Sequence, residues 1–439
     1  MAKSSRKQGQ EPAASRGRVA LVDGVRTPFV RAFAEFKDLN ATDLARFVVR
    51  ELLQKTELDP EVIDEVIMGA VLPPTHAPNI AREVVLGLGL PRRIPGFTVT
   101  RACASSVQAL INAAEGIMTG EYDVVIAGGT ESMSNLPVTY SKGVVDSLMA
   151  LSKARTLGAR MKALSGLKLE EFVPRPPEIA ETSTGRSMGQ HAELMARKNG
   201  ISRAEQDEFA LQSHLRAAAA AEDGRTAEEL CPVWAPPNFA PVERDMMVRP
   251  DTSLEALGSL KPAFDRRYGT LTAGNSSGLT DGASAVLVMS EARARELGYT
   301  PLAYLKSWAS TSLDPDDQLL LGPAYAIPMA LDRAGLTLAE MDLVELHEAF
   351  AAQVLSVLKA LESADFAREK LGRDEPVGAV DRSRLNVNGG SIALGHPFGA
   401  TGTRMVLGAA RELARRDARY ACLSLCTAGA MGTAMVLER

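Results

Sequence analysis

The chain has 439 residues, of which 46% are hydrophobic and 23% are charged, a composition typical of a globular α/β protein that excludes a wholly disordered chain. The net charge of -5, from 49 lysines and arginines against 54 aspartates and glutamates, gives no general reason to expect nucleic-acid binding. No stretch approaches the roughly 20 continuous apolar residues of a membrane-spanning helix, which excludes an integral membrane protein.

Residues 1–17 are basic and polar, carry Lys3, Arg6, Lys7 and Arg16, and have no apolar core of a signal peptide. We expect a disordered tail. A transit peptide is the alternative, although the segment lacks an amphipathic apolar face. The four cysteines of the chain are too few and too scattered for a disulfide framework, which is typical of a reducing compartment, and we expect a cytoplasmic protein.

The first part of the chain predicts a helix over residues 43–55, an apolar strand that ends at Gly69, and a helix and strand over 107–129 that follow Cys103. At a helix N-terminus, free N–H groups and the helix dipole favour a thiolate and can bind a developing oxyanion. The small neighbours of Cys103 leave room for a substrate. Cys103 is therefore a candidate nucleophile, with an unreactive buried cysteine as the alternative.

Residues 137–262 break this pattern with proline-rich turns, and we interpret them as an inserted loop domain. Within it, residues 141–175 hold an excess of basic side chains over three acidic ones, Asp146, Glu170 and Glu171. This excess favours phosphates or a membrane surface as ligands, whereas a solvated helix face is the alternative. The seven basic residues are Lys142, Lys153, Arg155, Arg160, Lys162, Lys168 and Arg175.

The last part of the chain repeats the order of the first. A helix over 326–334 precedes a strand that ends at His347, and His396 precedes a helix and strand over 403–426, in the place that Cys103 has in the first part. This order predicts two duplicated α/β halves, with chance similarity of two amphipathic units as the alternative. Since ligands gather at the carboxyl ends of strands in such sheets, we expect the matching motifs to meet in one pocket.

His396 lies in the glycine-rich stretch 386–402, where a ligand can approach the backbone closely. A neutral imidazole there could take the proton of Cys103 near physiological pH. A phosphate-binding loop is the rival interpretation, but the stretch has no Gly-Lys-Ser/Thr ending and no dinucleotide fingerprint. The sequence therefore favours a general base.

Cys426 ends a strand before a turn rich in glycine and alanine, where a thiol could exchange a proton with a carbon acid. Cys422 lies on the same face of that strand and is assigned to the core. We expect no metal site, because no second pair of ligands has the spacing that zinc requires. His347 could hold a water or polarise a carbonyl, with Glu348 orienting it, and a capping or core role is the alternative.

Four motifs, in the same order, resemble the thiolases, which cleave 3-ketoacyl-CoA with CoA or run the reverse Claisen condensation. The most specific is Gly-His-Pro at 395–397 in its Asn-Val-Asn-Gly-Gly setting, followed by the turn after Cys426. The segment 22–29, Val-Asp-Gly-Val-Arg-Thr-Pro-Phe, is similar to the family's opening strand, and 273–283 is similar to its segment beside the CoA pantetheine arm. The resemblance spans residues 18–439.

The resemblance implies that Cys103 is the acylated nucleophile, that His396 is its activating base, and that Cys426 is the acid and base for the acetyl-CoA carbon. It places Met188 and Ser277 along the CoA site. It also implies that no cofactor is bound permanently and that CoA is a co-substrate, with its phosphates near the basic residues of the loop domain.

His347 stands where many thiolases have an asparagine that holds a water in an oxyanion hole. Together with Arg101 and Ala428, it resembles the 3-ketoacyl-CoA thiolase β-subunits of fatty-acid oxidation complexes. The resemblance implies that backbone N–H groups near Cys103 and Ala428 form the second oxyanion hole. Ala430, where glycine is usual, departs from the family pattern in that loop.

The family implies a five-layered αβαβα thiolase fold, at least a dimer, and an accompanying hydratase/dehydrogenase α subunit. We expect a tail at 1–17, an N-terminal core domain at 18–136 plus 263–300, a loop domain at 137–262 and a C-terminal core domain at 301–439. A weak peripheral membrane contact through the basic segment is a further expectation.

The function predicted from the sequence is cleavage of 3-ketoacyl-CoA to acetyl-CoA and a shortened acyl-CoA in fatty acid β-oxidation, by ping-pong covalent cysteine catalysis. The enzymatic alternatives are a biosynthetic acetoacetyl-CoA thiolase and a decarboxylating, ketosynthase-like condensing enzyme. A non-catalytic acyl-CoA-binding subunit is the alternative of another class.

Overall fold

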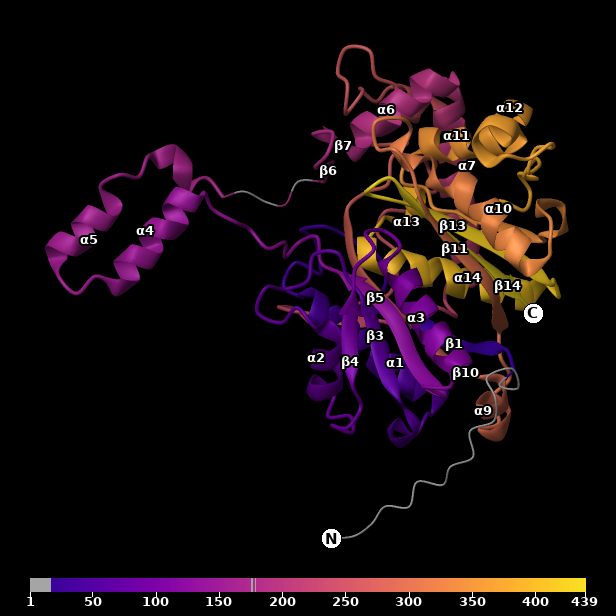
Figure 1. The fold of residues 1–439 in the computed structure, drawn as a ribbon, viewed down its shortest axis with the longest axis horizontal. Helices are drawn as coiled ribbons and strands as arrows, with labels where there is room; N and C mark the ends of the chain where they lie inside the picture. Colours follow the sequence, from indigo (N-terminus) through magenta and orange to yellow (C-terminus); the bar gives the residue numbers. More distant parts are fainter. Residues whose placement is uncertain (1–16, 175–176, 178) are drawn as a thin grey trace, which may run out of the picture.

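The computed structural model describes residues 17–174, 177 and 179–439 (Figure 1). The expected tail lies outside these residues except for Gly17, and Arg175 of the basic segment lies outside them too. Among the described residues, no helix combines the length and the apolar character that crossing a membrane would require.

The strands of the first half form a mixed sheet in the order β1-β10-β5-β3-β4. β3 is parallel to β4 and β5, whereas β10 is antiparallel to both β5 and β1. The short β2 (Val30–Arg31) pairs with β10 at its end. The five strands are β1 (Val19–Arg26), β3 (Glu65–Gly69), β4 (Gly96–Val99), β5 (Val124–Glu131) and β10 (Thr280–Ser290).

The strands of the second half repeat this pattern in the order β11-β14-β13-β12, with β12 parallel to β13 and the other pairs antiparallel. A parallel bridge between Val344 and Leu385 stands where the first half has β4. The two halves join through antiparallel pairing of β1 with β11. The four strands are β11 (Ala303–Ser312), β12 (Leu343–Leu346), β13 (Tyr420–Thr427) and β14 (Met431–Glu438).

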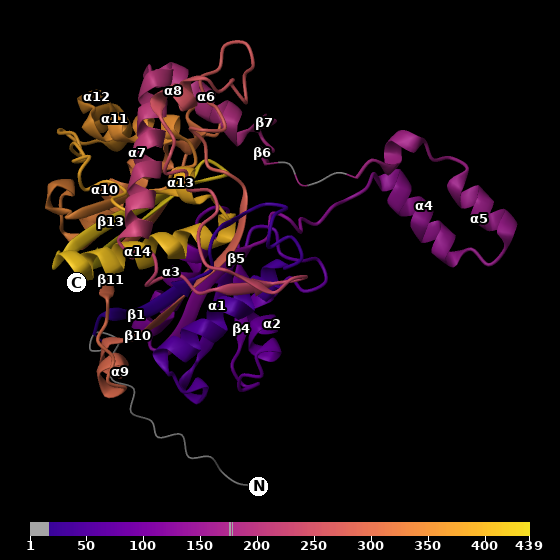
Figure 2. The same cartoon turned by 180° about the vertical axis from the view of Figure 1, so that it is seen from behind.

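Helices cover both faces of each half, which gives five layers (Figures 1 and 2). The central layer is α3 (Ser105–Thr119) with α14 (Thr401–Arg416), and their apolar faces share one core with strands of both halves. The outer layers are α1 (Ala41–Thr56) and α2 (Ile80–Gly87) on the first half, and α10 (Gly322–Ala334) and α11 (Ala351–Glu362) on the second.

Strand periodicity explains this layering. Alternate residues of β5 point to opposite faces, so Val125 and Ala127 join the central core while Val124 and Ile126 join the outer core under α1. The halves approach so closely at Gly129 that an added Cβ would lie 1.9 Å from the carbonyl oxygen of Gly399. The loops that follow the parallel strands of both halves therefore meet between them.

The segment 137–262 contains two parts with different surroundings. The helical hairpin of α4 (Lys142–Lys153) and α5 (Leu157–Leu164), called the arm below, projects from the body (Figures 1 and 2). The rest packs on both halves. β6 (Ala180–Glu181), β7 (Arg186–Ser187), α6 (Met188–Asn199), α7 (Arg203–Glu222) and α8 (Leu254–Gly258) lie on the side of the second half, whereas β8 (Val233–Ala235) and β9 (Ala240–Val242) pack against the core of the first half. Shorter helices elsewhere are α9 (Glu291–Glu296), α12 (Ala364–Phe366) and α13 (Ser391–Leu394).

The predicted helices and strands of both halves occur, with ends that differ by a few residues. The largest difference is α10, which begins at Gly322 and not at 326. The duplication predicted from the order of elements is confirmed by the matching strand orders of the two halves.

Candidate active site

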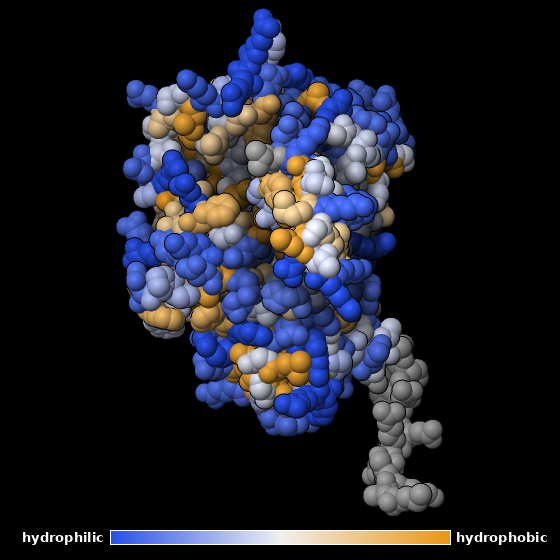
Figure 3. Space-filling view, turned by 90° about the vertical axis from the view of Figure 1, so that its left-hand side faces the viewer, coloured by the Kyte–Doolittle hydropathy of each residue, from blue (hydrophilic) through white to orange (hydrophobic). Residues whose placement is uncertain are grey.

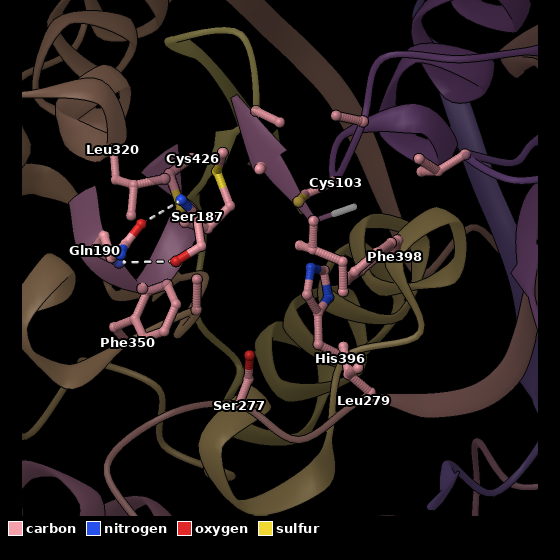
Figure 4. Close-up of a pocket in the computed structure, with 18 of the residues that line it drawn as sticks. Cys103, Ser187, Gln190, Ser277, Leu279, Leu320, Phe350, His396, Phe398 and Cys426 are labelled. Carbon is pink, nitrogen blue, oxygen red and sulfur yellow. Dashed lines mark hydrogen bonds between the residues drawn. The ribbon is translucent and has the colours of Figure 1, made fainter. Parts of the chain in front are cut away.

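A cavity of about 790 Å³ opens where the two halves meet the loop segment (Figure 4). Its walls hold Cys103, His396 and Cys426, and the remaining lining is mainly apolar. The sequence predicted that these three side chains and His347 meet in one pocket. The structure places the three in the wall of one cavity, whereas His347 lies against His396 and is not among the lining residues.

Cys103 lies in a tight turn between β4 and α3, with Ala102 before it at φ +42°. Helix α3 begins at Ser105, so Cys103 precedes the helix and does not open it. The backbone N–H groups of Cys103 and Ala428 hydrogen-bond to its sulfur, but burial outweighs them and raises the pKa of the thiol to about 12. The backbone N–H groups thus lower the pKa of the thiol, as the sequence predicted, but desolvation is the larger effect.

His396 is held as an uncharged base. Its Nδ1 is 2.7 Å from Thr401 Oγ1, and its backbone N–H donates to the carbonyl of Gly278. Burial, with a smaller effect of the Arg404 guanidinium, lowers the pKa of His396 to about 3. With its proton on Nδ1 toward Thr401, the ring presents Nε2 to the cavity as an acceptor, and Nε2 has no partner among the described residues.

The turn before His396 requires glycine. Gly395 has φ +96°, and a Cβ at this position would lie 2.3 Å from Cγ2 of Thr280. A side chain would therefore both strain the backbone and displace the loop that carries His396. This is the local reason for glycine in the Gly-His-Pro motif.

His347 follows β12 directly and packs against His396, with ring centroids 4.2 Å apart. Its Nδ1 is 3.2 Å from Ser391 Oγ, and its Nε2 has no partner among the described residues. Burial, and then the neighbouring His396, lower the pKa of His347 well below its ordinary value. The donor atoms of Cys103, His347 and His396 all lie within 4.8 Å of one another.

Glu348 does not orient His347, contrary to the sequence-based expectation. Its buried carboxylate accepts hydrogen bonds from Ser213 Oγ at 2.6 Å, Asn386 Nδ2 at 2.7 Å and the backbone N–H of Ile392 at 3.1 Å. It thereby ties α7 to the two loops that lead to His396. The hydrogen-bond partner of the His347 ring is Ser391, which sequence reasoning missed.

Cys426 ends β13 in the wall of the cavity across from Cys103 (Figure 4). Burial, with a smaller effect of Cys103, raises the pKa of its thiol well above the ordinary value. Cys422 is fully buried in the core of the second half, as predicted.

The turn after Cys426 carries Ala428, which lines the cavity, and Ala430. Ala430 adopts φ +53°, a left-handed conformation in which glycine avoids the steric cost of a Cβ. The loop is nevertheless fixed: the Ala430 carbonyl accepts from Leu313 N–H at 2.7 Å, and Gly429 N–H donates to Glu181 at 2.9 Å. The departure from glycine thus leaves the Ala428 N–H directed at Cys103.

The candidate CoA-binding residues Met188 and Ser277 line the cavity from the side of α6 and the second half. The Ser277 hydroxyl points into the cavity in Figure 4, and its backbone N–H donates to the carbonyl of Ala349. Phe350 completes this wall and is braced by Phe264, with ring centroids 5.6 Å apart.

Sequence reasoning also missed two buried charged residues. Glu131 accepts the backbone N–H groups of Val71, Leu72 and Gly399, each at 3.0 Å, and so ties the cavity wall of the first half to the His396 loop. Burial raises the pKa of Glu131 to about 7. Its only sequence signal is a carboxylate at the end of an apolar strand.

The second is Arg404 of α14, whose Nη2 donates to Ser391 Oγ at 3.2 Å and so supports the residue that contacts His347. Burial lowers the pKa of Arg404, and nearby Glu345, whose pKa is raised to about 8 by burial, partly balances its charge. A positive charge behind the histidines helps to keep both rings neutral.

Comparisons with known proteins agree with this arrangement. The thiolase N-terminal domain model matches residues 19–292, and the thiolase C-terminal domain model matches 299–439. A 3-ketoacyl-CoA thiolase of Photobacterium profundum is 48% identical over 421 residues, which are 96% of this chain and 97% of that protein. The human mitochondrial 3-ketoacyl-CoA thiolase in complex with CoA superposes with a TM-score of 0.81 at 35% identity, covering 96% of this chain and 98% of that one.

A third similar protein is the acetyl-CoA acetyltransferase of Bacillus anthracis. It has a TM-score of 0.80 and 32% identity, with 96% of this chain and 98% of that one covered.

Proposed function

This chain belongs to the thiolase family, and on that premise we propose that the cavity around Cys103 and His396 carries its reaction. The chain is a 3-ketoacyl-CoA thiolase, an acyltransferase that cleaves 3-ketoacyl-CoA with CoA in fatty acid β-oxidation. The observation that supports the assignment of residues is that two cysteines and an unpartnered imidazole nitrogen face the same cavity.

In the first half-reaction, the sulfur of Cys103 attacks C3 of the substrate while its proton passes to Nε2 of His396. Because the pKa of the Cys103 thiol is raised and that of the His396 imidazole is lowered, both groups are neutral at rest. The proton therefore moves as the bond between sulfur and C3 forms. The backbone N–H groups of Cys103 and Ala428, which favour negative charge on the Cys103 sulfur, are proposed to stabilise the new C3 oxyanion.

The C2–C3 bond then breaks, which leaves Cys103 acylated and the acetyl-CoA part as an enolate. The imidazolium of His396 and the adjacent His347 are placed to stabilise the enolate oxygen. Cys426 gives its proton to C2, so acetyl-CoA leaves and Cys426 remains as a thiolate.

In the second half-reaction, the Cys426 thiolate takes the proton of an incoming CoA thiol. The CoA sulfur attacks the acyl thioester, and the departing Cys103 sulfur takes back the proton held by His396. All three groups return to their starting states. Acetyl-CoA leaves before CoA binds, which gives ping-pong kinetics. Double-reciprocal plots of the thiolysis rate against one substrate at several concentrations of the other should therefore be parallel, and intersecting lines would contradict the scheme.

A ketosynthase-like condensing enzyme has no need of a second cysteine opposite the nucleophile, so Cys426 in the cavity favours the thiolase. For a biosynthetic acetoacetyl-CoA thiolase, the similarity to the Bacillus anthracis acetyltransferase is the supporting observation. A thiolysis assay over a series of 3-ketoacyl chain lengths separates the two: cleavage confined to acetoacetyl-CoA would favour the biosynthetic enzyme.

The domain division proposed for the chain is 18–136 plus 263–300, 137–262 and 301–439. In support, β10 and α9 of the segment 263–300 complete the first half, and β11 begins the second. We propose CoA as a co-substrate bound along Met188 and Ser277, with no permanent cofactor.

We propose that the chain forms at least a dimer. β4 is an edge strand of the first half, and Gly96–Val99 are only partly buried, whereas the matching edge of the second half is covered by the bridge at Leu385. A strand edge of this kind can pair with a second copy. A hydratase/dehydrogenase α subunit is proposed from the resemblance alone. All four cysteines are free, as a reducing compartment leaves them, and we propose a cytoplasmic location.

The arm is the proposed site of a weak peripheral membrane contact. It exposes large apolar side chains beside basic ones, and Figure 3 shows the side of the molecule from which it projects. Flotation with anionic vesicles should be lost when the arm's lysines and arginines are reversed in charge, and unchanged flotation would contradict this contact. The exposed apolar residues are Val145, Leu148, Met149, Leu157, Met161 and Leu164.

A further inference from the structure

Cys103, His347 and His396 form the one group of three metal-type donors found in the described part of the chain. Both histidines use Nδ1 for a hydroxyl, Ser391 for His347 and Thr401 for His396. Both Nε2 atoms are buried without a partner among the described residues. One sulfur and two imidazole nitrogens therefore share a small space beside the part of the cavity wall that Cys103 and His396 line.

We infer that this group binds a zinc ion and that the ion inhibits the enzyme. The inhibitory consequence rests on the proposed function, because it assumes that Cys103 and His396 carry the reaction. The ion is a reversible ligand of the free enzyme and takes no part in thiolysis.

The donor set fits zinc chemically. Zn²⁺ prefers thiolate and imidazole ligands, and sites with three protein ligands leave a fourth position for water. The hydroxyl behind each ring takes the place of the carboxylate, carbonyl or water that usually holds the second nitrogen of a metal-binding histidine. Calcium and magnesium prefer oxygen ligands, so neither fits this set.

The distances require a modest contraction. Bond lengths of about 2.0–2.3 Å around a tetrahedral ion place neighbouring donors about 3.3–3.6 Å apart. The donors here lie within 4.8 Å, so the largest separation must close by about 1 Å. Rotation of the Cys103 side chain, which borders the open cavity, can supply this movement.

The charge and proton balance is simple. The Cys103 thiol loses its proton to solvent as the sulfur binds the ion, and nothing is oxidised or reduced. The Arg404 guanidinium opposes a cation here, whereas the thiolate formed on Cys103 favours it.

Binding removes the nucleophile and the base together, so free enzyme with zinc cannot be acylated. Acylation has the opposite effect, because an acylated Cys103 offers no thiolate to the ion. The acyl-enzyme should therefore resist zinc. This mutual exclusion distinguishes the site from zinc bound elsewhere on the chain.

His347 makes the site a feature of this chain. His347→Asn removes the third donor and introduces asparagine, the residue that many other thiolases have at this position. We expect the inhibition constant for Zn²⁺, relative to the variant's own uninhibited rate, to rise at least about tenfold.

The test uses the full-length protein in metal-free buffer with Co²⁺ and Zn²⁺ as probes. Titration with Co²⁺ should give a thiolate-to-cobalt absorption band in the near ultraviolet, and Zn²⁺ should displace it. The band should be absent in Cys103→Ala and in enzyme acylated beforehand. The matched control is Cys231→Ser. Cys231 is buried outside the cavity, and its thiol donates to the backbone carbonyl of Arg26 at 3.3 Å.

A cobalt band that persists in Cys103→Ala, or zinc inhibition unchanged by His347→Asn and by prior acylation, would overturn the inference. The spectrum needs no turnover. If the metal-free protein showed no thiolysis while the cobalt band appeared and depended on Cys103, the proposed function would fail and the metal site would stand.

Discussion

The imidazole rings of His347 and His396 lie with centroids 4.2 Å apart and planes inclined by 48°, each anchored through Nδ1 to a different hydroxyl. The two rings come from loops of the same half that are 49 positions apart in the chain, and Ser391, between them in sequence, fixes the first. Both rings are thus held with Nε2 free of a partner among the described residues, and the following expectations test parts of that arrangement.

Alkylation of Cys103 by iodoacetamide should report its raised pKa. Because the thiolate is the nucleophile and the pKa of the Cys103 thiol is about 12, the rate should rise about tenfold per pH unit from pH 6 to 9.5. Mass spectrometry of the labelled peptide, with Cys103→Ser as background, measures this. A plateau above pH 7 would show a thiolate–imidazolium pair at rest and contradict the neutral starting state.

Thr401→Val should lower kcat by about 10- to 100-fold with little change in KM for CoA. The variant keeps the shape of the side chain but removes the hydroxyl that fixes the His396 tautomer. Thr403→Val is the matched control, since Thr403 is equally buried on the same helix and its hydroxyl has no partner among the described residues. Equal losses of kcat in the two variants would show that the hydroxyl of Thr401 does not position His396.

Gly395→Ala should destabilise the fold and abolish most activity. At φ +96° and ψ 174°, a backbone conformation essentially confined to glycine, a side chain costs about 1–3 kcal/mol, and the contact with Thr280 adds displacement of the His396 loop. Gly298→Ala is the comparison variant, because Gly298 also has a positive φ, +80°, but has open space around it. Urea unfolding and thiolysis are measured together. If both variants lose the same stability and keep activity, the close contact has no role in placing His396.

Glu131→Gln should change how stability depends on pH. Burial raises the folded-state pKa of Glu131 from 4.5 to about 7, so the folded protein holds a proton that the unfolded chain has lost between these values. The stability contribution of Glu131 is therefore largest below pH 4.5 and falls as pH rises through 7. A shift of this size corresponds to about 3 kcal/mol.

The measurement is the difference in unfolding free energy between parent and Glu131→Gln at pH 5 and pH 8, in which contributions of other groups cancel. The parent should lose about 2.5 kcal/mol relative to the variant over this range, because part of the shift lies below pH 5. A difference independent of pH would mean that Glu131 is ionised throughout.

Much of this architecture could be predicted from the sequence. Amphipathic periods located both halves, and the scarcity of cysteine and histidine outside glycine-rich turns directed attention to Cys103, His396 and Cys426. The sequence could not predict that the Cys103 thiol is uncharged. Burial raises its pKa, and this burial depends on packing between halves that are distant in the chain. The same holds for Glu131 and Ser391, whose partners are backbone groups or side chains of other loops.

The most direct test of the central claim is the intact mass of the protein after mixing with a 3-ketoacyl-CoA in the absence of free CoA. We expect one acyl group per chain, mapped to Cys103 by peptide analysis, with release of acetyl-CoA that is strongly slowed in Cys426→Ala. An adduct on Cys426, or thiolysis at the parental rate by Cys103→Ala, would contradict the account.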